Sequence, residues 1–140
     1  MEQLEQRVET LIEELPVCFI TYIDREGYPI AKAMLPPRER KGFREIWFST
    51  NTSSQKVRAF REDPKASVYF MDRSRFQGVS LVGTVEVLET PEAKERLWRQ
   101  GDQLYYKQGV NDPDYCVLRF NAVKGRYYHN FQSEDFEVRD

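Results

Sequence analysis

The sequence predicts a mainly β protein, a small antiparallel barrel of six or seven strands with about three helices at its periphery. Short apolar stretches alternate with segments rich in Gly, Pro, Asn and Asp, a pattern typical of strands joined by hairpins. Aromatic residues make up 14% of the chain, which suits a sheet-rich core. The length of 140 residues fits one domain, so residues 1–140 are expected to fold as a single unit.

One helix and three strands are predicted first. Apolar residues recur at helical spacing over residues 3–15, and Pro16 ends this helix. Two apolar stretches, 17–23 and 28–35, flank a turn in which Gly27 can adopt the positive φ of a hairpin loop. Residues 36–42 are predicted to form a loop. Residues 45–50 then alternate as a strand, with Ile46 and Phe48 on one face and Trp47 on the other.

Two further helices and the remaining strands follow. Residues 51–54 are of types that cap helices, and a short helix is predicted over 55–62. Residues 66–71 and 79–88 are predicted strands, and Gly83 indicates a bulge or a close backbone approach. Thr90 and Pro91 begin a third helix that extends to about residue 101. Strands at 115–120 and 126–131 are expected to flank a turn at 121–125, before a loosely ordered acidic tail from Ser133.

Composition argues against several function classes. The chain has 21 basic and 23 acidic side chains, so its small net charge disfavours nucleic acid as a partner, including an oligonucleotide-binding barrel. No apolar run approaches the length of a membrane span and the N-terminus is acidic, so we expect a cytoplasmic protein without a membrane partner. Cys18 and Cys116 are expected to be buried free thiols. His129 has no nucleophile or ligand spaced near it, so no metal site is predicted.

One segment, residues 46–60, matches a specific chemical task. Hydroxyl side chains at the end of a strand, unpaired N–H groups in the first turn of a helix and Lys56 in the same turn would converge on one point of positive potential. Such a point accommodates a phosphate monoester. The alternative is that Ser53 or Ser54 only caps the helix and that Lys56 is a solvated surface charge.

Nearly the whole chain resembles the pyridoxamine 5′-phosphate oxidase-like FMN-binding split barrels, and in particular their small general-stress-protein branch. Residues 29–34 match a pattern like Pro-x-x-Arg-x-Met through Pro29, Lys32 and Met34. Residues 48–58 match a pattern like Phe-x-Thr-x-x-x-Ser-Arg-Lys-x-x. Residues 63–68 and 83–87 resemble the next two strands of the family.

The resemblance implies a split barrel and a homodimer with FMN bound between the subunits. It also implies that Lys32, Thr50, Ser54, Gln55 and Lys56 hold the phosphate. The flavin ring would lie along the strands near Ala33, Met34, Phe48 and Ser49, with the partner chain closing the other side. Tyr105, Tyr106 and the turn at 111–114 are candidates for that closing surface, although no family motif identifies them.

Two positions depart from the family pattern. Lys32 and Gln55 stand where many members have arginine, so a point charge and a neutral amide replace two planar forks suited to phosphate. The loss of one charge-assisted hydrogen bond would weaken FMN binding roughly 10- to 100-fold, and we expect partial occupancy. Arg58 lies about 200° around the helix from Lys56, and on this ground it is not expected to replace Gln55.

The leading hypothesis is an FMN-dependent oxidoreductase that transfers hydride or electrons to an unknown small substrate. The cofactor carries that chemistry, which agrees with the lack of a catalytic constellation among the side chains. The alternative is a non-enzymatic module that binds or senses flavin, a deazaflavin or haem. The vitamin oxidase activity itself is not expected, because residues 127–140 show no clear Trp or Arg pattern for a pyridoxal-type substrate.

Overall fold

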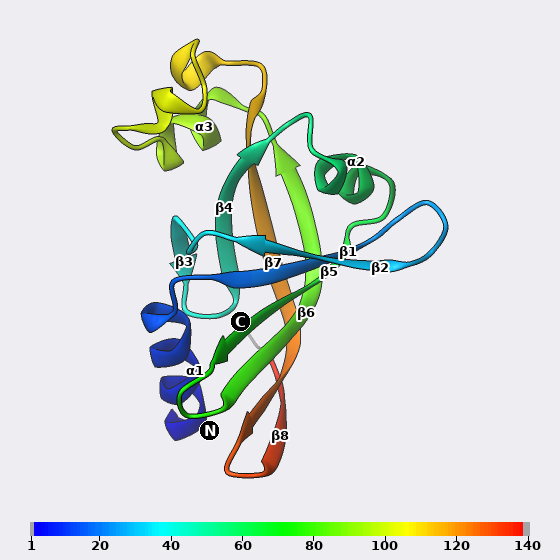
Figure 1. The fold of residues 1–140 in the computed structure, drawn as a ribbon, viewed down its shortest axis with the longest axis vertical. Coiled ribbons are helices and arrows are strands. Elements are labelled where there is room, and N and C mark those ends of the chain that lie inside the picture. The colour runs from blue at the N-terminus through cyan, green and yellow to red at the C-terminus, as the bar shows by residue number, and fades with distance from the viewer. Residues whose placement is uncertain (1, 139–140) are drawn as a thin grey trace.

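The computed structural model describes residues 2–138, which form three α-helices, two 3-10 turns and eight strands (Figure 1). The helices are α1 (Glu2–Glu14), α2 (Gln55–Glu62) and α3 (Pro91–Leu97), and the 3-10 turns are η1 (Asp102–Leu104) and η2 (Gly109–Asn111). The strands are β1 (Cys18–Ile23), β2 (Pro29–Met34), β3 (Glu39–Lys41), β4 (Glu45–Asn51), β5 (Lys65–Asp72), β6 (Gln77–Leu88), β7 (Tyr115–His129) and β8 (Gln132–Glu137).

All eight strands belong to one antiparallel sheet. Its order is β2-β1-β5-β6-β7-β4-β3, and β8 pairs with the far end of β7. The two ends of this path, β2 and β3, do not pair with each other within residues 2–138, so the strongly curved sheet stays open. The predicted fold class, a mainly β antiparallel split barrel with three helices, is therefore confirmed, with one strand more than the six or seven expected.

The sheet buries a different cluster of side chains on each side. The larger cluster fills the interior of the curved sheet and includes Ile20, Phe48, Phe70 and Phe120, closed by apolar residues of α1 and α2. The smaller cluster lies between β4, β7 and α3 and is built around Trp47. Strand alternation explains both, because Phe48 and Trp47 point to opposite faces of β4.

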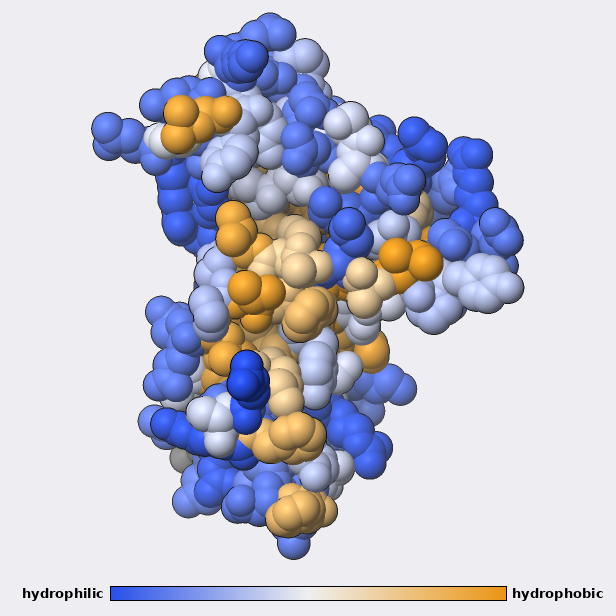
Figure 2. Space-filling model, in the orientation of Figure 1, coloured by the Kyte–Doolittle hydropathy of each residue, from blue (hydrophilic) through white to orange (hydrophobic). Residues whose placement is uncertain are grey.

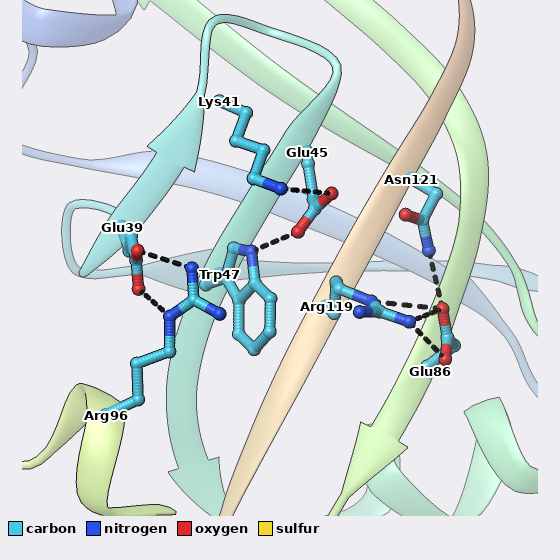
Figure 3. Close-up of polar contacts among 8 residues, drawn as sticks. All are labelled: Glu39, Lys41, Glu45, Trp47, Glu86, Arg96, Arg119 and Asn121. Carbon is cyan, nitrogen blue, oxygen red and sulfur yellow. Dashed lines mark hydrogen bonds and ion pairs between the residues drawn. The ribbon is translucent and has the colours of Figure 1, made fainter. Parts of the chain in front are cut away.

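The smaller cluster is bordered by paired charges, which attach α3 to the sheet (Figure 3). Trp47 lies between the guanidinium groups of Arg96 and Arg119, which are 4.5 and 5.4 Å from its ring centroid. Arg96 donates two hydrogen bonds of 2.7 Å to Glu39, and Arg119 donates to Glu86. This arrangement fixes the position of the segment that follows α3.

The predicted helices and the first hairpin are confirmed with small shifts in their ends. Gly27 has φ +88° in the β1–β2 turn, as expected. Thr90 caps α3 by accepting a hydrogen bond from the Ala93 N–H. The third helix ends at Leu97 and not near residue 101, because the backbone of Trp98 is extended, with ψ 134°; Gly101, with φ +102°, then precedes η1.

Residues 36–42, predicted to be a loop, contain the short edge strand β3. It pairs with β4 so that Arg40 lies opposite Ile46. Its three residues are all charged, so no alternation of apolar and polar side chains indicated a strand. The Arg40 guanidinium donates to Glu9 and Glu13 of α1, so its charge connects the edge strand to the helix.

The predicted hairpin at residues 121–125 is wrong, because these residues are the middle of one 15-residue strand, β7. Gly125 serves close packing rather than a turn: a Cβ there would lie 2.4 Å from the Phe136 ring. The turn falls at Asn130 and Phe131, which have φ of +48° and +62°. The tail predicted to be loosely ordered forms β8, which pairs with β7 over six residues.

Gly83 marks both features predicted for it. The register between β6 and β7 shifts between Val82 and Gly83, as in a β-bulge. A Cβ at position 83 would lie 1.9 Å from the carbonyl oxygen of Asn121. Only glycine allows the two backbones to approach this closely.

Candidate functional site

A cavity of about 310 Å³ opens where the end of β2 meets the end of β4. Residues 33–36 form one wall and residues 48–51 the opposite wall. The remaining lining comes from Arg38, Asp102, Tyr105 and Tyr106, which precede β3 or follow α3. Four predicted site residues, Ala33, Met34, Phe48 and Ser49, thus line one cavity with the predicted phosphate ligand Thr50.

The loop from β4 into α2 leaves the first helical N–H groups available. Ser54 is the N-cap residue, but its side chain accepts no hydrogen bond from the first turn. Its hydroxyl instead donates to the carbonyl of Asn51 at 2.8 Å. The first turn also contains no acidic residue. The alternative that Ser54 satisfies these amides as a side-chain cap therefore fails, and the amides remain free for an anion.

Two lysines, Lys32 and Lys56, lie close enough at this helix start for one charge to act on the other. Ile30, Lys32 and Met34 share one face of β2, and Lys32 pairs across the ladder with Ile20. Burial, and then the charge of Lys32, lower the pKa of Lys56 from its ordinary value. Because like charges raise each other's energy, an anion between these two lysines would be stabilised by both. Lys56 is therefore not a simple solvated surface charge.

Two hydroxyl groups at and just after the end of β4, those of Ser49 and Thr52, are buried without hydrogen-bond partners among residues 2–138. Thr50, which lies between them in the chain, is 5% exposed and lines the cavity. The buried Ser49 hydroxyl lies near the Tyr115 phenol, but this phenol donates to the Lys94 carbonyl and leaves Ser49 unbonded among residues 2–138. Buried hydroxyls normally find a partner, so the Ser49 hydroxyl, which belongs to a residue that lines the cavity, could bond a polar group of a ligand.

Asp114, the residue before β7, holds the loop between β4 and α2 in place. Its carboxylate accepts from the Ser53 N–H at 2.8 Å and from the Asn51 side-chain amide at 3.1 Å. The Thr52 N–H donates to the Asp114 carbonyl at 2.8 Å. The hydrogen bonds from Asn51 and Ser53 lower the pKa of Asp114. The loop shape is thereby fixed without a ligand.

The far end of the cavity is closed by a charged clamp. Arg38 donates two hydrogen bonds of 2.8 Å to the Asp102 carboxylate and a third to the Leu97 carbonyl. The hydrogen bonds from Arg38 lower the pKa of Asp102. Tyr106 packs beside them, and burial raises the pKa of its phenol to about 12, so it stays a neutral hydrogen-bonding group. Tyr105 remains exposed at the cavity edge.

Gln55 lies apart from the cavity. It lines a separate groove of about 270 Å³ between α2 and the β1–β2 hairpin, together with Ile30 and Arg58. Arg58 follows Gln55 by three residues, so the two side chains lie on one side of the helix. The angle of about 200° separates Arg58 from Lys56 but not from the side of the helix that carries Gln55.

Several contacts of the site could not be predicted from the sequence. The pairing of Arg38 with Asp102 spans 64 residues, and Asp114 bonds Ser53 and Asn51 across 61 and 63 residues, so no local pattern indicates these contacts. Tyr105, Tyr106 and Asp114 were candidates for the surface of a partner subunit. The structure places them against the cavity and the loop of their own chain.

The remaining reactive groups lie elsewhere. Cys18 and Cys116 are buried free thiols, as predicted, and burial raises the pKa of Cys18 to about 12. His129 stacks on Tyr127 with ring centroids 4.9 Å apart. Within residues 2–138, no group of three or more His, Cys, Asp or Glu side chains could hold a metal ion. None of the described helices combines the length and apolar character needed to cross a bilayer.

The split-barrel sheet and this site define the class of protein. Residues 4–129 match the family model described as pyridoxamine 5′-phosphate oxidase, and the chain belongs to that family. No curated protein matches it in sequence.

Within the family, this chain is similar to a protein from Clostridium acetobutylicum related to general stress protein 26 of B. subtilis. The two are 35% identical, with a TM-score of 0.90 over 99% of this chain and 96% of that one. General stress protein 26 from Bacillus anthracis shares the fold at 15% identity, with a TM-score of 0.79 over 97% and 99% of the chains. A heme binding protein from Mycobacterium smegmatis shares it at 18% identity, with a TM-score of 0.75 over 95% of this chain and 57% of that one.

Proposed function

We propose that this protein binds FMN, with the phosphate at the start of α2 and the flavin ring in the adjoining cavity. The observation that carries the proposal is that Lys56, on which the charge of Lys32 acts, lies in the uncapped first turn of α2, close in the chain to residues Thr50 and Asn51 of the cavity. A phosphate dianion would satisfy the lysines and the amides together. The cavity would take the planar part of the ligand.

The residues of the chain suit a binding and orienting role. Met34 and Phe48 offer apolar contacts, while Ser49 and Thr50 offer hydroxyls to polar edges of a ring. When bound, FMN supplies hydride or electron transfer, and the protein contributes position and electrostatics. We therefore propose an FMN-dependent oxidoreductase that acts on a small molecule.

The same proposal includes a homodimer. The outward faces of β1, β2 and β5 carry apolar side chains, and Figure 2 shows this surface as an orange region down the middle of the molecule. Phe19 is 43% exposed and pairs across the ladders with Ala33 and Tyr69. Ala33 and the exposed Leu35 also line the cavity. A second copy on this face would thus cover both the apolar surface and the cavity mouth.

The test of activity uses FMN-loaded protein under anaerobic conditions. NADH or NADPH is added, and the visible absorbance of the oxidised flavin is followed over time. Bleaching at a rate that depends on protein concentration is expected of an oxidoreductase. Stable binding of FMN without bleaching by either nicotinamide would contradict enzymatic turnover with these donors and favour a binding or sensor role.

A further inference from the structure

We infer that Arg58 supplies the guanidinium that FMN binding lacks at Gln55, as a second phosphate-binding cation reached through the groove between α2 and the β1–β2 hairpin. The inference rests on the proposed function and assigns a residue that the family pattern does not contain. Because Gln55 stands where many family members have arginine, the sequence predicts that the phosphate lacks one cation. With Arg58 in this role, the phosphate regains that cation.

The position of Arg58 on α2 is the first observation that supports this inference. Gln55 and Arg58 are one helical turn apart and line the same groove with Ile30. Ile30 lines the groove and shares one face of β2 with Lys32, so the groove lies beside the lysine whose charge acts on Lys56. Side chains on a helix lean toward its N-terminus, so the patch that Arg58 covers is the first turn, where the free amides lie.

The second support is that Arg58 has no competing partner. Its side chain forms no hydrogen bond or ion pair within the described part of the chain, although Glu62 is four residues away. Glu62 is already bound by Arg25, which donates to it at 2.9 Å. Asp24, the next acidic group in the groove, accepts from the N–H groups of Glu26 and Tyr28.

The acidic groups of the groove do not prevent an anion from binding beside it. Asp24 and Glu62 are engaged as described, and the remaining carboxylate, Glu26, is exposed in the hairpin turn. The single negative charge of Glu26 is outnumbered by the positive charges of Arg58, Lys32 and Lys56. Cations that lack partners and surround free amides are the arrangement that a doubly charged phosphate stabilises.

The test measures the affinity of the full-length protein for FMN and for riboflavin, which lacks the phosphate, by quenching of flavin fluorescence. Arg58→Gln is expected to weaken FMN binding roughly 10-fold, the lower end for a charge-assisted hydrogen bond because the side chain is exposed, and to leave riboflavin binding unchanged. Arg73→Gln is the matched control, since Arg73 is an exposed arginine without a partner among residues 2–138 and lies in the β5–β6 turn.

A second variant separates charge from helix structure. Gln55→Arg combined with Arg58→Gln is expected to restore FMN affinity to within about 3-fold of wild type, which a purely structural role of Arg58 would not allow. If wild type binds FMN and Arg58→Gln binds it equally well, this inference is overturned and the proposed function stands. If wild type binds neither flavin, both are overturned.

Discussion

At the scale of single residues, Lys56 lies where its ammonium form is destabilised unless an anion is bound nearby. Burial and the charge of Lys32 lower its pKa, so the free protein favours the neutral amine more than an exposed lysine does. A bound phosphate reverses this preference, because it stabilises the ammonium form. Binding of FMN and protonation of Lys56 are therefore linked.

This linkage predicts a bell-shaped dependence of FMN affinity on pH. Affinity should rise as the phosphate loses its second proton near a pKa of about 6. It should then fall as pH rises through the lowered pKa of Lys56, where the amine loses its charge. Lys56→Arg should flatten the upper limb, because a guanidinium keeps its charge. Titrations at a series of pH values check this, and an upper limb identical in wild type and Lys56→Arg would refute it.

The residues that sequence reasoning found and missed differ in one physical respect. Thr50, Ser54 and Lys56 are close together in the chain, so the strand–turn–helix pattern of residues 46–60 was enough to predict their role. The role that we infer for Arg58 depends on its spacing of three residues from Gln55, whereas the contact of Asp114 with Ser53 spans 61 residues, which no local pattern encodes. The site residues remain predictions until a ligand is measured on them.

At the scale of elements, the long strands β6 and β7 bend the sheet around the core, and Gly83 permits their closest approach. The sequence predicted this bulge, since a lone glycine within a strand usually marks a bulge or a close backbone approach. At Gly125 the sequence predicts a turn, and this prediction is wrong, because the glycine lies within β7 and makes room for Phe136. Local composition cannot distinguish a glycine that turns from one that packs.

Gly83→Ala should destabilise the protein by about 2–3 kcal/mol, because its Cβ would collide with backbone that cannot rotate away. Gly27→Ala is the comparison: nothing lies within 4 Å of its Cβ, and the cost of about 1 kcal/mol comes from its positive φ alone. Urea unfolding of both variants gives the free energies. If Gly83→Ala lowered the free energy of unfolding less than Gly27→Ala does, the close approach at the bulge would be contradicted.

The Arg38–Asp102 clamp joins the segment before β3 to the segment after α3. Asp102→Asn should cost about 2–4 kcal/mol of unfolding free energy, because it leaves a largely buried guanidinium without its counter-charge. Asp135→Asn, in the exposed Arg126–Asp135 pair, should cost almost nothing. Urea unfolding of the two variants measures both costs.

The clamp also predicts a direction for pH dependence. The pKa of Asp102 is lowered, so its contribution is complete above the ordinary aspartate range and is lost as pH falls through the lowered value. Urea midpoints measured from pH 7 downward should therefore fall less steeply for Asp102→Asn than for wild type. Parallel curves would show that the pair does not contribute.

At the scale of the whole molecule, the apolar face of β1, β2 and β5 and the mouth of the cavity form one continuous surface. Because Ala33 and Leu35 belong to both, the dimer that we propose would cover the apolar face and complete the site together.

Sedimentation should give twice the chain mass of 16.7 kDa. Phe19→Glu should yield monomers and weaken FMN binding, because a charge would be buried in the interface. Phe131→Glu, at the exposed β7–β8 turn, should leave the dimer intact. A monomeric wild type, or a Phe19→Glu dimer with normal affinity, would rule out this interface.

The central claim, that the start of α2 recognises a phosphate and the cavity a flavin ring, is tested most directly by one comparison. FMN and riboflavin are titrated against wild type and Lys56→Ala with flavin fluorescence as the signal. We expect wild type to prefer FMN, and Lys56→Ala to lose roughly 10- to 100-fold in FMN affinity with little change for riboflavin. Equal affinity of wild type for the two flavins, or FMN binding that Lys56→Ala leaves unchanged, would contradict the claim.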